Sequence, residues 1–335
     1  MISSHEKPEL ANALVMLDVG HGNCAILLDD DKVVVVDTGP GVTLDTFLEK
    51  QKIKHVDTIL ISHADADHIG GLAALLASKR VTVGKVRLNT DSLKGSHAWD
   101  DLAHELSKND SIDFQPVLTV DDSGVFNTKN VSVEVAAPTT YLAAKGPGSK
   151  DREGRKIDTN SLSAVIRLVY QDKPFALLPG DLDAVGLENL LEAGSSIQAP
   201  IIVFPHHGGR PGTSDIPLFV SKLLGAVCAE TIIFSIGRGR HGTPRPELIQ
   251  AIRKQVSDVR IACTQLSKHC AEKVPASHSG HFHPTHAHGH AQSSGCGGTF
   301  VYHFETGVLH PKVELHRQFI QVSAEKALCM KNDEP

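Results

Sequence analysis

Four potential metal ligands fall within six residues of the segment SHADADHIGG, residues 62–71: His63, Asp65, Asp67 and His68. They directly follow an apolar run, VDTILI, residues 56–61. On an extended turn, alternate side chains point to one side and the following residue turns away, so one short loop can serve two adjacent cations. A helix N-cap would explain Asp67 alone but not all four residues. The segment therefore predicts a metal site.

Two further polar pairs also end apolar runs. Gly180–Asp181 follows FALLP, and His206–His207 follows IIVFP. The ends of strands present side chains to a shared cleft, so these pairs are expected near the first segment. A single aspartate is also typical of a turn. Imidazole is the commonest metal ligand, and we expect one histidine of the pair to bind metal while the other orients the loop.

A basic loop, GRGRHGTPRP, occupies residues 237–246. It places His241 among Arg238, Arg240 and Arg245. Guanidinium groups on an open, glycine-rich backbone suit a phosphate. A solvated loop without a ligand explains the same composition, and the sequence leaves both interpretations open.

Short apolar runs alternate with amphipathic stretches and predict an α/β protein in which these loops connect strands to helices. Two strand-rich halves, each flanked by helices, predict a layered sandwich. Predicted strands cover residues 13–20, 23–30, 32–41, 56–63, 85–90, 114–120, 131–138, 161–170, 174–181, 199–209, 230–237 and 258–265. Predicted helices cover residues 43–52, 70–79, 97–108, 184–193, 216–226 and 246–255. Residues 145–156 are predicted to form an exposed, mobile loop.

Composition excludes several classes of protein. Among 335 residues, 33 basic and 39 acidic side chains give a net charge of −6, which does not fit a protein that binds nucleic acid through overall positive charge. Bound cations can still supply positive charge locally. No signal peptide and no apolar run of about 18–20 residues is evident, so we expect a cytoplasmic protein without a membrane partner.

The C-terminal region is rich in cysteine and histidine. Cys263, Cys270 and Cys296, with one histidine of the segment 275–298, could form a structural zinc site. The spacing of the first two cysteines is wide for such a site, and buried free thiols are the alternative. Residues 275–298 are predicted to form a flexible loop that binds metal adventitiously.

The motifs together resemble the metallo-β-lactamase superfamily, and within it the hydrolase domain of the competence protein ComEC. The resemblance covers about residues 13–250 and rests on DVGHGNCAIL, VVVVDTG, ISHADADHIGG, TNSLSAVIRL, ALLPGD and VFPHHGG, in that order. It implies a four-layer αββα sandwich over residues 1–255. A Cys/His-containing β extension, residues 256–335, is expected to pack on the same domain.

The resemblance also implies roles for individual residues. His63 and Asp65 would hold one divalent cation, Asp67, His68 and His206 the second, and Asp181 would bridge both. A hydroxide between the two cations, Zn²⁺ or Mn²⁺, would attack the substrate, and Asp67 could orient it. The remaining expected site residues are His241 in catalysis and Asn160, Arg238, Arg240 and His207 in substrate binding.

Three departures from the superfamily pattern bear on the metal. Asp65 stands where many members carry histidine, which favours Mn²⁺ while leaving Zn²⁺ open. The segment DTNSLS, residues 158–163, lacks the histidine that many members have there, so the first cation would be openly coordinated. His21 and Asn23 replace the glutamine and aspartate of ComEC-like domains. His21 either lines the cleft or supports the turn.

Three functions remain as hypotheses. The favoured one is a dinuclear phosphodiesterase, a nuclease acting on DNA or RNA. The second is a hydrolase of a small ester, such as a cyclic nucleotide, lactone or thioester; a narrow, closed pocket would favour it, and an open basic groove would favour nucleic acid. The third is an effector controlled by a regulatory partner or a protease acting on residues 145–156, with a role in phage defence as one setting. The sequence does not determine the oligomeric state.

Overall fold

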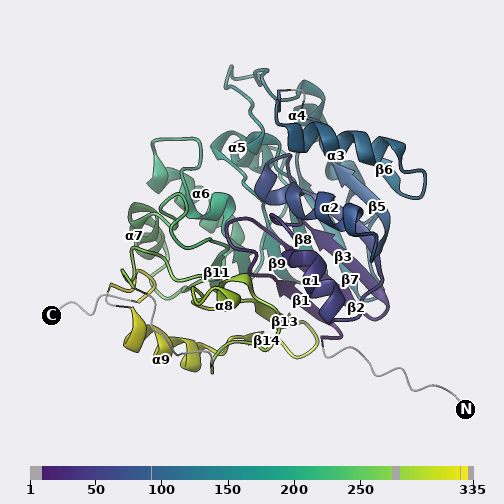
Figure 1. Cartoon of the computed structure of the whole chain (residues 1–335). Helices are drawn as coiled ribbons and strands as arrows, with labels where there is room; N and C mark the ends of the chain where they lie inside the picture. Colours follow the sequence, from purple (N-terminus) through teal and green to yellow (C-terminus); the bar gives the residue numbers. More distant parts are fainter. Residues whose placement is uncertain (1–9, 92, 274–279, 325, 331–335) are drawn as a thin grey trace, which may run out of the picture.

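Two β-sheets lie face to face and carry helices on their outer faces (Figure 1). This computed structural model describes residues 10–91, 93–273, 280–324 and 326–330. The strand order is β14-β13-β1-β2-β3-β4-β5-β6 in the first sheet and β12-β11-β10-β9-β8-β7 in the second. The predicted α/β class and αββα layering are confirmed.

The first sheet has eight strands, and its interior strands are buried on both faces. In β3, Val33 and Val35 pack toward the helices, whereas Val34 and Val36 pack between the sheets. This alternation explains why the run VVVV forms a strand with no polar face. The strands are β1 Ala13–Met16, β2 Ala25–Asp29, β3 Lys32–Val36, β4 His55–Ile61, β5 Thr82–Leu88, β6 Asp113–Gln115, β13 Phe300–His303 and β14 Val308–His310.

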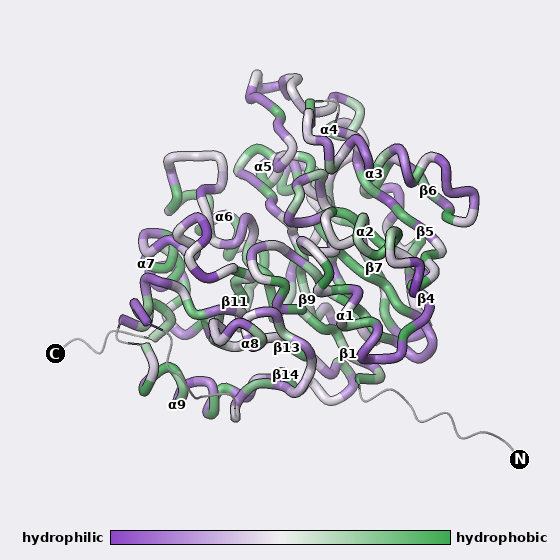
Figure 2. The backbone as a smooth tube through the Cα atoms, in the orientation of Figure 1, coloured by the Kyte–Doolittle hydropathy of each residue, from purple (hydrophilic) through white to green (hydrophobic). Residues whose placement is uncertain are grey.

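The second sheet has six strands, of which β9 to β12 run parallel. Parallel neighbours need crossover connections, and helices supply them. The strands are β7 Val131–Ala137, β8 Val165–Tyr170, β9 Lys173–Leu178, β10 Ile201–Val203, β11 Thr231–Phe234 and β12 Arg260–Cys263. Figure 2 shows largely hydrophobic strands in the interior and more hydrophilic helices and loops around them.

The longer helices, all except α4 and α8, bury one apolar face each against the sheets. Phe47 and Leu72 belong to the core of the first sheet, and Phe219 and Leu248 to the core of the second. The helices are α1 Thr43–Lys50, α2 Ala66–Ser78, α3 His97–Lys108, α4 Thr140–Lys145, α5 Ala184–Glu192, α6 Ile216–Val227, α7 Pro246–Gln255, α8 His288–Ala291 and α9 Val313–Ser323. No helix in the described ranges combines the length and apolar character needed to cross a bilayer.

The C-terminal extension contributes strands to both sheets. β12 pairs with β11 at Ile261 and Ile232, and β13 pairs with β1 at Val301 and Val15. α9 was not predicted, because its short apolar stripe follows directly on the hairpin β13–β14; its Phe319 packs into the core of the second sheet. The division at residue 255 therefore marks no break in either sheet.

Residues 145–156 are tied to the domain by ion pairs. Arg155 pairs with the buried carboxylate of Asp151 and with Glu188 on α5. A backbone bridge joins Lys150 to Lys156, and the N–H of Gly148 donates to the carbonyl of Ile157. The segment forms a short hairpin in which Asp151, Glu153 and Arg155 are ion-paired, and its predicted mobility stays a prediction.

Candidate metal centre

The side chains that could bind metal gather at one edge of the sandwich, where strands from both sheets end. His63 and His68 follow β4, Asp181 follows β9, and His207 follows β10. His21 comes from the loop between β1 and β2. The carboxyl ends of parallel strands meet at the same edge of a sheet, so residues far apart in the sequence become neighbours here.

A first group of ligand atoms comes from His63, His68 and Asp181, and all three residues are buried. Nε2 of His68 lies 3.2 Å from Oδ1 of Asp181, and Nε2 of His63 lies 3.8 Å from Oδ2. The two imidazole rings are 4.1 Å apart between centroids. Two imidazole nitrogens and a carboxylate therefore converge on one point.

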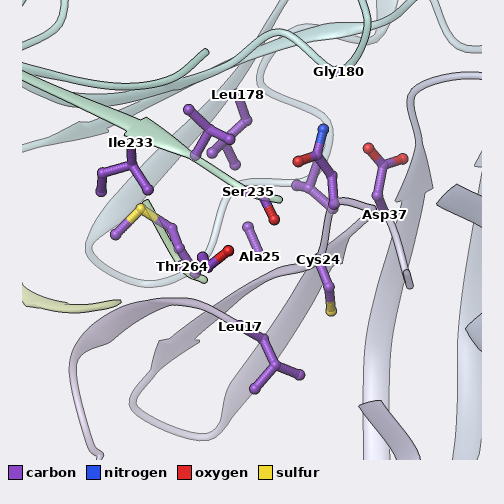
Figure 3. Close-up of a pocket in the computed structure, with 13 residues that line it drawn as sticks. Leu17, Cys24, Ala25, Asp37, Leu178, Gly180, Ile233, Ser235 and Thr264 are labelled. Carbon is purple, nitrogen blue, oxygen red and sulfur yellow. The ribbon is translucent and has the colours of Figure 1, made fainter. Parts of the chain in front are cut away.

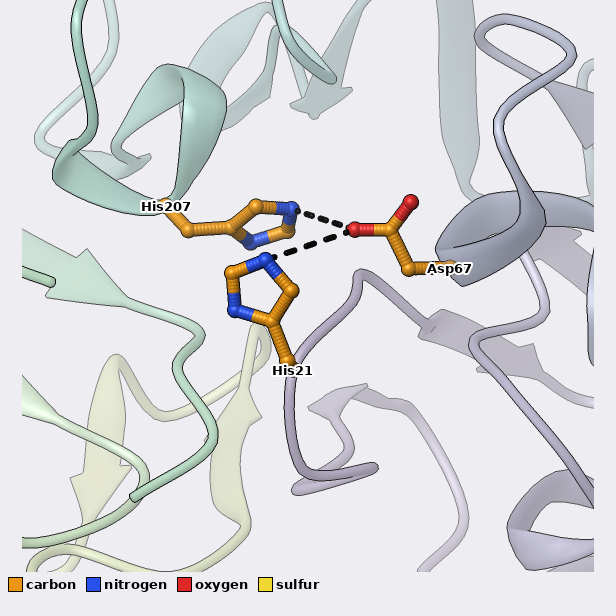
Figure 4. A group of neighbouring side chains, drawn as sticks. All are labelled: His21, Asp67 and His207. Atoms are coloured by element: carbon orange, nitrogen blue, oxygen red, sulfur yellow. Dashed lines mark ion pairs between the residues drawn. The ribbon is translucent and has the colours of Figure 1, made fainter. Parts of the chain in front are cut away.

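A second group comprises His21, Asp67 and His207 (Figure 4). Oδ2 of Asp67 lies 3.3 Å from Nε2 of His207 and 3.6 Å from Nε2 of His21. Asp181 connects the two groups, because its Oδ1 is also 3.4 Å from Nε2 of His207. The arrangement offers two neighbouring sites that share one carboxylate.

Several of these atoms lack hydrogen-bond partners, which fits a cation site. In the described part of the chain, seven buried side-chain nitrogen or oxygen atoms have no partner. Four of the seven are Nε2 of His63, His68 and His207 and Oδ1 of Asp181. An unpaired buried polar atom costs about 1–3 kcal/mol, so their concentration in one cleft fits a set of cation ligands. Imidazole nitrogen and carboxylate oxygen are donors suited to Zn²⁺.

The opposite ring nitrogens are fixed by neighbours. Nδ1 of His68 donates to Oδ2 of Asp37 at 2.8 Å, and Nδ1 of His207 donates to the Ser235 carbonyl at 2.8 Å. The hydroxyl of Ser62 donates to Asp37, so its oxygen accepts from Nδ1 of His63 at 3.0 Å. With the proton on Nδ1, each Nε2 lone pair faces the cleft, as metal-binding histidines require.

Backbone conformation brings the loops together. Gly180 has φ +55°, and a Cβ there would lie 2.3 Å from Oγ of Ser163, so only glycine fits. His206 and His207 both adopt left-handed φ values, +52° and +53°. Such conformations cost about 1–3 kcal/mol each in a non-glycine residue and concentrate at functional sites. The turn places His207 inside the cleft and His206 at its rim.

The electrostatics of the cleft favour a bound cation. Burial opposes the charge of Asp181, but His207 and His68 outweigh burial and hold its pKa well below the ordinary value. Burial lowers the pKa of His68, yet Asp181 and Asp37 outweigh it and raise that pKa well above 6.5. Burial, with His207, lowers the pKa of His21 to about 3. The carboxylates and imidazoles of this cleft therefore suit a cation, and its binding would displace any proton shared among them.

Two of the predicted ligands, Asp65 and His206, belong to neither of the two ligand groups. Asp65 forms an ion pair with Lys94, and its Oδ2 is 3.9 Å from Nε2 of His63. His206 has a side chain 36% exposed; its Nδ1 lies 4.0 Å from Oδ2 of Asp181 and 3.1 Å from Nδ2 of Asn160. The structure thus brings His207, expected in substrate binding, closer to Asp67 and Asp181 than His206.

The basic loop lies beside the centre. The ring of His241 is exposed and 4.5 Å from the ring of His21. The guanidinium of Arg238 donates to the carbonyls of Leu266, Ala271 and Glu272, so its donors are used within the protein rather than for substrate. The side chain of Arg240 is exposed and borders a groove that also contains His21.

A small cavity lies between the sheets beneath the centre (Figure 3). Its volume is only 20 Å³, little more than one water molecule needs. Asp37 and Ser235 line it together with apolar side chains such as Leu178 and Ile233. It has no room for a substrate, so this cavity is not itself a substrate site.

The cysteines lie away from the centre. Cys263, Cys270 and Cys296 line one small cavity together with Cys329, and all are free thiols. Sγ of Cys296 is 3.3 Å from Nε2 of His316. Within the described ranges, ligand atoms converge closely only in the two groups of the cleft, so a structural zinc ion at the cysteines stays a prediction.

Sequence reasoning left the role of His21 open and did not identify Lys94. The signal for His21 was its place in a glycine-flanked turn after a buried strand. No sequence signal pointed to Lys94, because a single lysine in a polar loop is ordinary. Its ion pair with Asp65 arises only because the fold brings the loop after β5 beside the loop after β4.

Comparisons with known proteins agree with the motifs. The family model described as the metallo-beta-lactamase superfamily matches residues 17–187, just over half of the chain. Competence protein ComA of Neisseria gonorrhoeae is 24% identical over 269 residues, 78% of this chain and 32% of that protein. ComE operon protein 3 of Bacillus subtilis (strain 168) is 24% identical over 211 residues, 62% of this chain and 24% of that protein. The chain thus spans about a third or less of these relatives.

Solved structures with a similar arrangement are more distant in sequence. The metallo-beta-lactamase fold protein YhfI from Bacillus subtilis aligns with a TM-score of 0.46 and 11% identity, covering 75% of this chain and 95% of that one. A diphosphatase from the PhnP family aligns with a TM-score of 0.43 and 13% identity, covering 75% and 94%.

Proposed function

The chain belongs to the metallo-β-lactamase superfamily and is a metal-dependent hydrolase, and from that premise we propose that it cleaves phosphodiester bonds in nucleic acid, DNA or RNA. One observation carries the proposal: His21 of the second ligand group also lines a groove that has cationic side chains and, among the described residues, no carboxylate in its lining. The likeness to competence proteins adds support by analogy only.

We assign one cation to His63, His68 and Asp181 and a second to His21, Asp67 and His207, with Asp181 shared between them. When bound, the divalent cations would supply positive charge to a phosphoryl oxygen and would lower the pKa of a bound water molecule. These two groups offer four imidazoles and two carboxylates, a set that favours Zn²⁺. The more oxygen-rich set expected with Asp65 favours Mn²⁺, which remains the alternative.

The surrounding side chains have separate tasks in this proposal. Asp67 faces both His21 and His207, where its second oxygen can accept a proton from the attacking water. The exposed ring of His241 at the rim can donate a proton to the leaving oxygen. Asn160 holds His206 at the entrance and can also contact substrate.

The shape of the groove favours a polymer over a small ester. The enclosed cavity beneath the centre has 20 Å³, whereas the outer groove has 730 Å³ and is open to solvent. Small-molecule sites usually bury most of their ligand in a largely apolar pocket. An open groove with Arg240 and Lys268 in its lining fits a charged chain better.

The test is a substrate panel on protein stripped of metal and reloaded with Mn²⁺ or Zn²⁺. It contains single-stranded DNA, double-stranded DNA, RNA, a cyclic nucleotide, a lactone and a thioester. We expect cleavage of DNA, and loss of that cleavage in Asp67→Ala. Hydrolysis of the small esters alone, or equal cleavage by wild type and Asp67→Ala, would refute the proposal.

A further inference from the structure

A groove adjoins the metal-binding groups and shares His21 with them. Its volume is 730 Å³, and it runs between the start of α1, the basic loop 237–246 and the C-terminal extension at α8. The lining residues are Val19, Gly20, His21, Pro40, Gly41, Val42, Thr43, Gly237, Arg238, Arg240, Gln265, Lys268, His288, Gln292 and Ser294. A ligand chain bound at the candidate metal-binding groups would meet this groove at His21.

The extension forms a fixed wall of the groove. The N–H of His288 donates to the carbonyl of Asp18, and the N–H of Gly289 donates to Oδ2 of Asp18, both at 2.8 Å. Oδ1 of the same buried carboxylate accepts from Gly20 and from Nε2 of Gln265, both at 3.0 Å. The wall is therefore bonded to the loop that carries His21. The part of the predicted flexible loop before residue 280 lies outside the described residues.

The charge of the groove is opposite to that of the whole chain. No aspartate or glutamate lines it, although the chain has a net charge of −6. Arg240 and Lys268 are exposed, and among the described residues neither has an ion-pair partner. Arg238 fixes the position of Lys268, because its guanidinium holds the carbonyls of Leu266 and Ala271.

Backbone donors reinforce this charge. The first turn of α1 lies in the wall of the groove, and its N-cap residue, Val42, supplies no side-chain acceptor. Free N–H groups at a helix N-terminus attract anions. At the opposite side, a Cβ on Gly239 would lie 2.7 Å from Cε of Lys268, so glycine allows the lysine to cross the basic loop. Anion-binding features thus face the groove from two elements.

We propose that this groove binds the sugar–phosphate backbone of a nucleic acid strand beside the scissile bond, with Arg240 and Lys268 as phosphate contacts. The inference rests on the proposed function and adds to it the mode of recognition. No Phe, Tyr or Trp lines the groove in the described ranges, so it lacks the aromatic platform on which bases usually stack. Phosphate contacts carry no base sequence, so binding is expected to be independent of sequence.

The test measures binding without cleavage. Fluorescence anisotropy of a labelled single-stranded 20-nucleotide DNA is recorded in EDTA over a range of salt concentrations. Each phosphate contact contributes about 0.7 to the slope of log K against log salt for a single strand, so Arg240→Gln/Lys268→Gln should flatten the slope by about 1.4. The matched control, Lys108→Gln/Arg317→Gln on α3 and α9, removes the same charges elsewhere and should leave the slope unchanged.

Two results would overturn the inference. In the first, the slope of the groove variant differs from the wild-type slope by less than half of the change expected for one phosphate contact. In the second, the control variant changes the slope as much as the groove variant does. Binding of two unrelated DNA sequences that differs more than about tenfold, or about 1.4 kcal/mol, would also contradict backbone recognition. Cleavage is scored separately with the reloaded protein. A wild-type protein that binds with the expected slope but never cleaves would disprove the proposed function and leave the groove standing. Cleavage by the wild type, together with equal slopes for the wild type and the groove variant, would support the proposed function and refute nucleic acid binding in the groove.

Discussion

Replacement of His207 by alanine should remove one metal ion, whereas the same change at its neighbour His206 should not. Nε2 of His207 faces Asp67 and Asp181 at 3.3 and 3.4 Å and has no hydrogen-bond partner. The side chain of His206 is 36% exposed, and its Nδ1 lies by Asn160. Both residues have nearly the same φ, so loss of either ring leaves a similar backbone strain and the two variants are matched.

The expected magnitudes differ widely. Loss of one cation removes several kcal/mol of transition-state stabilisation, which lowers kcat by about a hundredfold or more. Loss of the contact between His206 and Asn160 removes about 0.5–1.5 kcal/mol and lowers activity by about tenfold at most. The ligand role expected for His206 from the family resemblance makes the opposite prediction.

The assay combines metal content with turnover. Each variant is stripped, reloaded with Zn²⁺ or Mn²⁺, dialysed and analysed by mass spectrometry for metal per chain, and then assayed for hydrolysis of bis(p-nitrophenyl) phosphate. We expect two ions in wild type and His206→Ala and one in His207→Ala. Two ions in His207→Ala with one in His206→Ala would refute the assignment.

Three further predictions concern the supports of the centre and of the fold. Asp37→Asn places an amide against Nδ1 of His68 and should weaken metal affinity by about 10–100-fold in chelator competition; unchanged affinity would contradict its orienting role. Gly180→Ala forces a Cβ against Ser163 and should lower the free energy of unfolding by at least about 1 kcal/mol in urea titration, whereas wild-type stability would show that the loop can shift. Burial lowers the pKa of His316 to about 3, so the unfolded chain takes up a proton below about 6.5 that the native protein takes up only near pH 3. Stability of the metal-free protein should thus fall with falling pH, by up to about 1.4 kcal/mol per unit from this group, and His316→Gln should flatten that slope by one proton; parallel slopes would exclude the contribution.

Much of the site followed from local sequence. His63, Asp67, His68 and Asp181 were predicted as ligands because polar residues directly after apolar strands must lie at a sheet edge; the structure brings all four together, and their binding of metal stays a prediction. Adjacent residues such as His206 and His207 could not be separated in this way. Which of two neighbours faces inward depends on a left-handed turn that neither residue's type requires.

Long-range contacts account for the other differences. The ion pair between Asp65 and Lys94 depends on a loop from another strand, and no local pattern predicts it. The role of the extension as a wall of the groove depends on Asp18, which lies 271 residues before Gly289 in the chain. The strands were easier to predict, because an unbroken apolar run such as VVVV indicates a strand buried on both faces, and this can be recognised without knowing which elements cover it.

Titration of the stripped protein with metal, followed by cleavage of single-stranded DNA, tests the central claim most directly. The account predicts no cleavage in EDTA, and activity that reaches its plateau only when two equivalents of Zn²⁺ or Mn²⁺ are bound per chain, with none restored in Asp181→Ala. A plateau at one equivalent, or cleavage of DNA by the stripped protein, would contradict a two-metal phosphodiesterase.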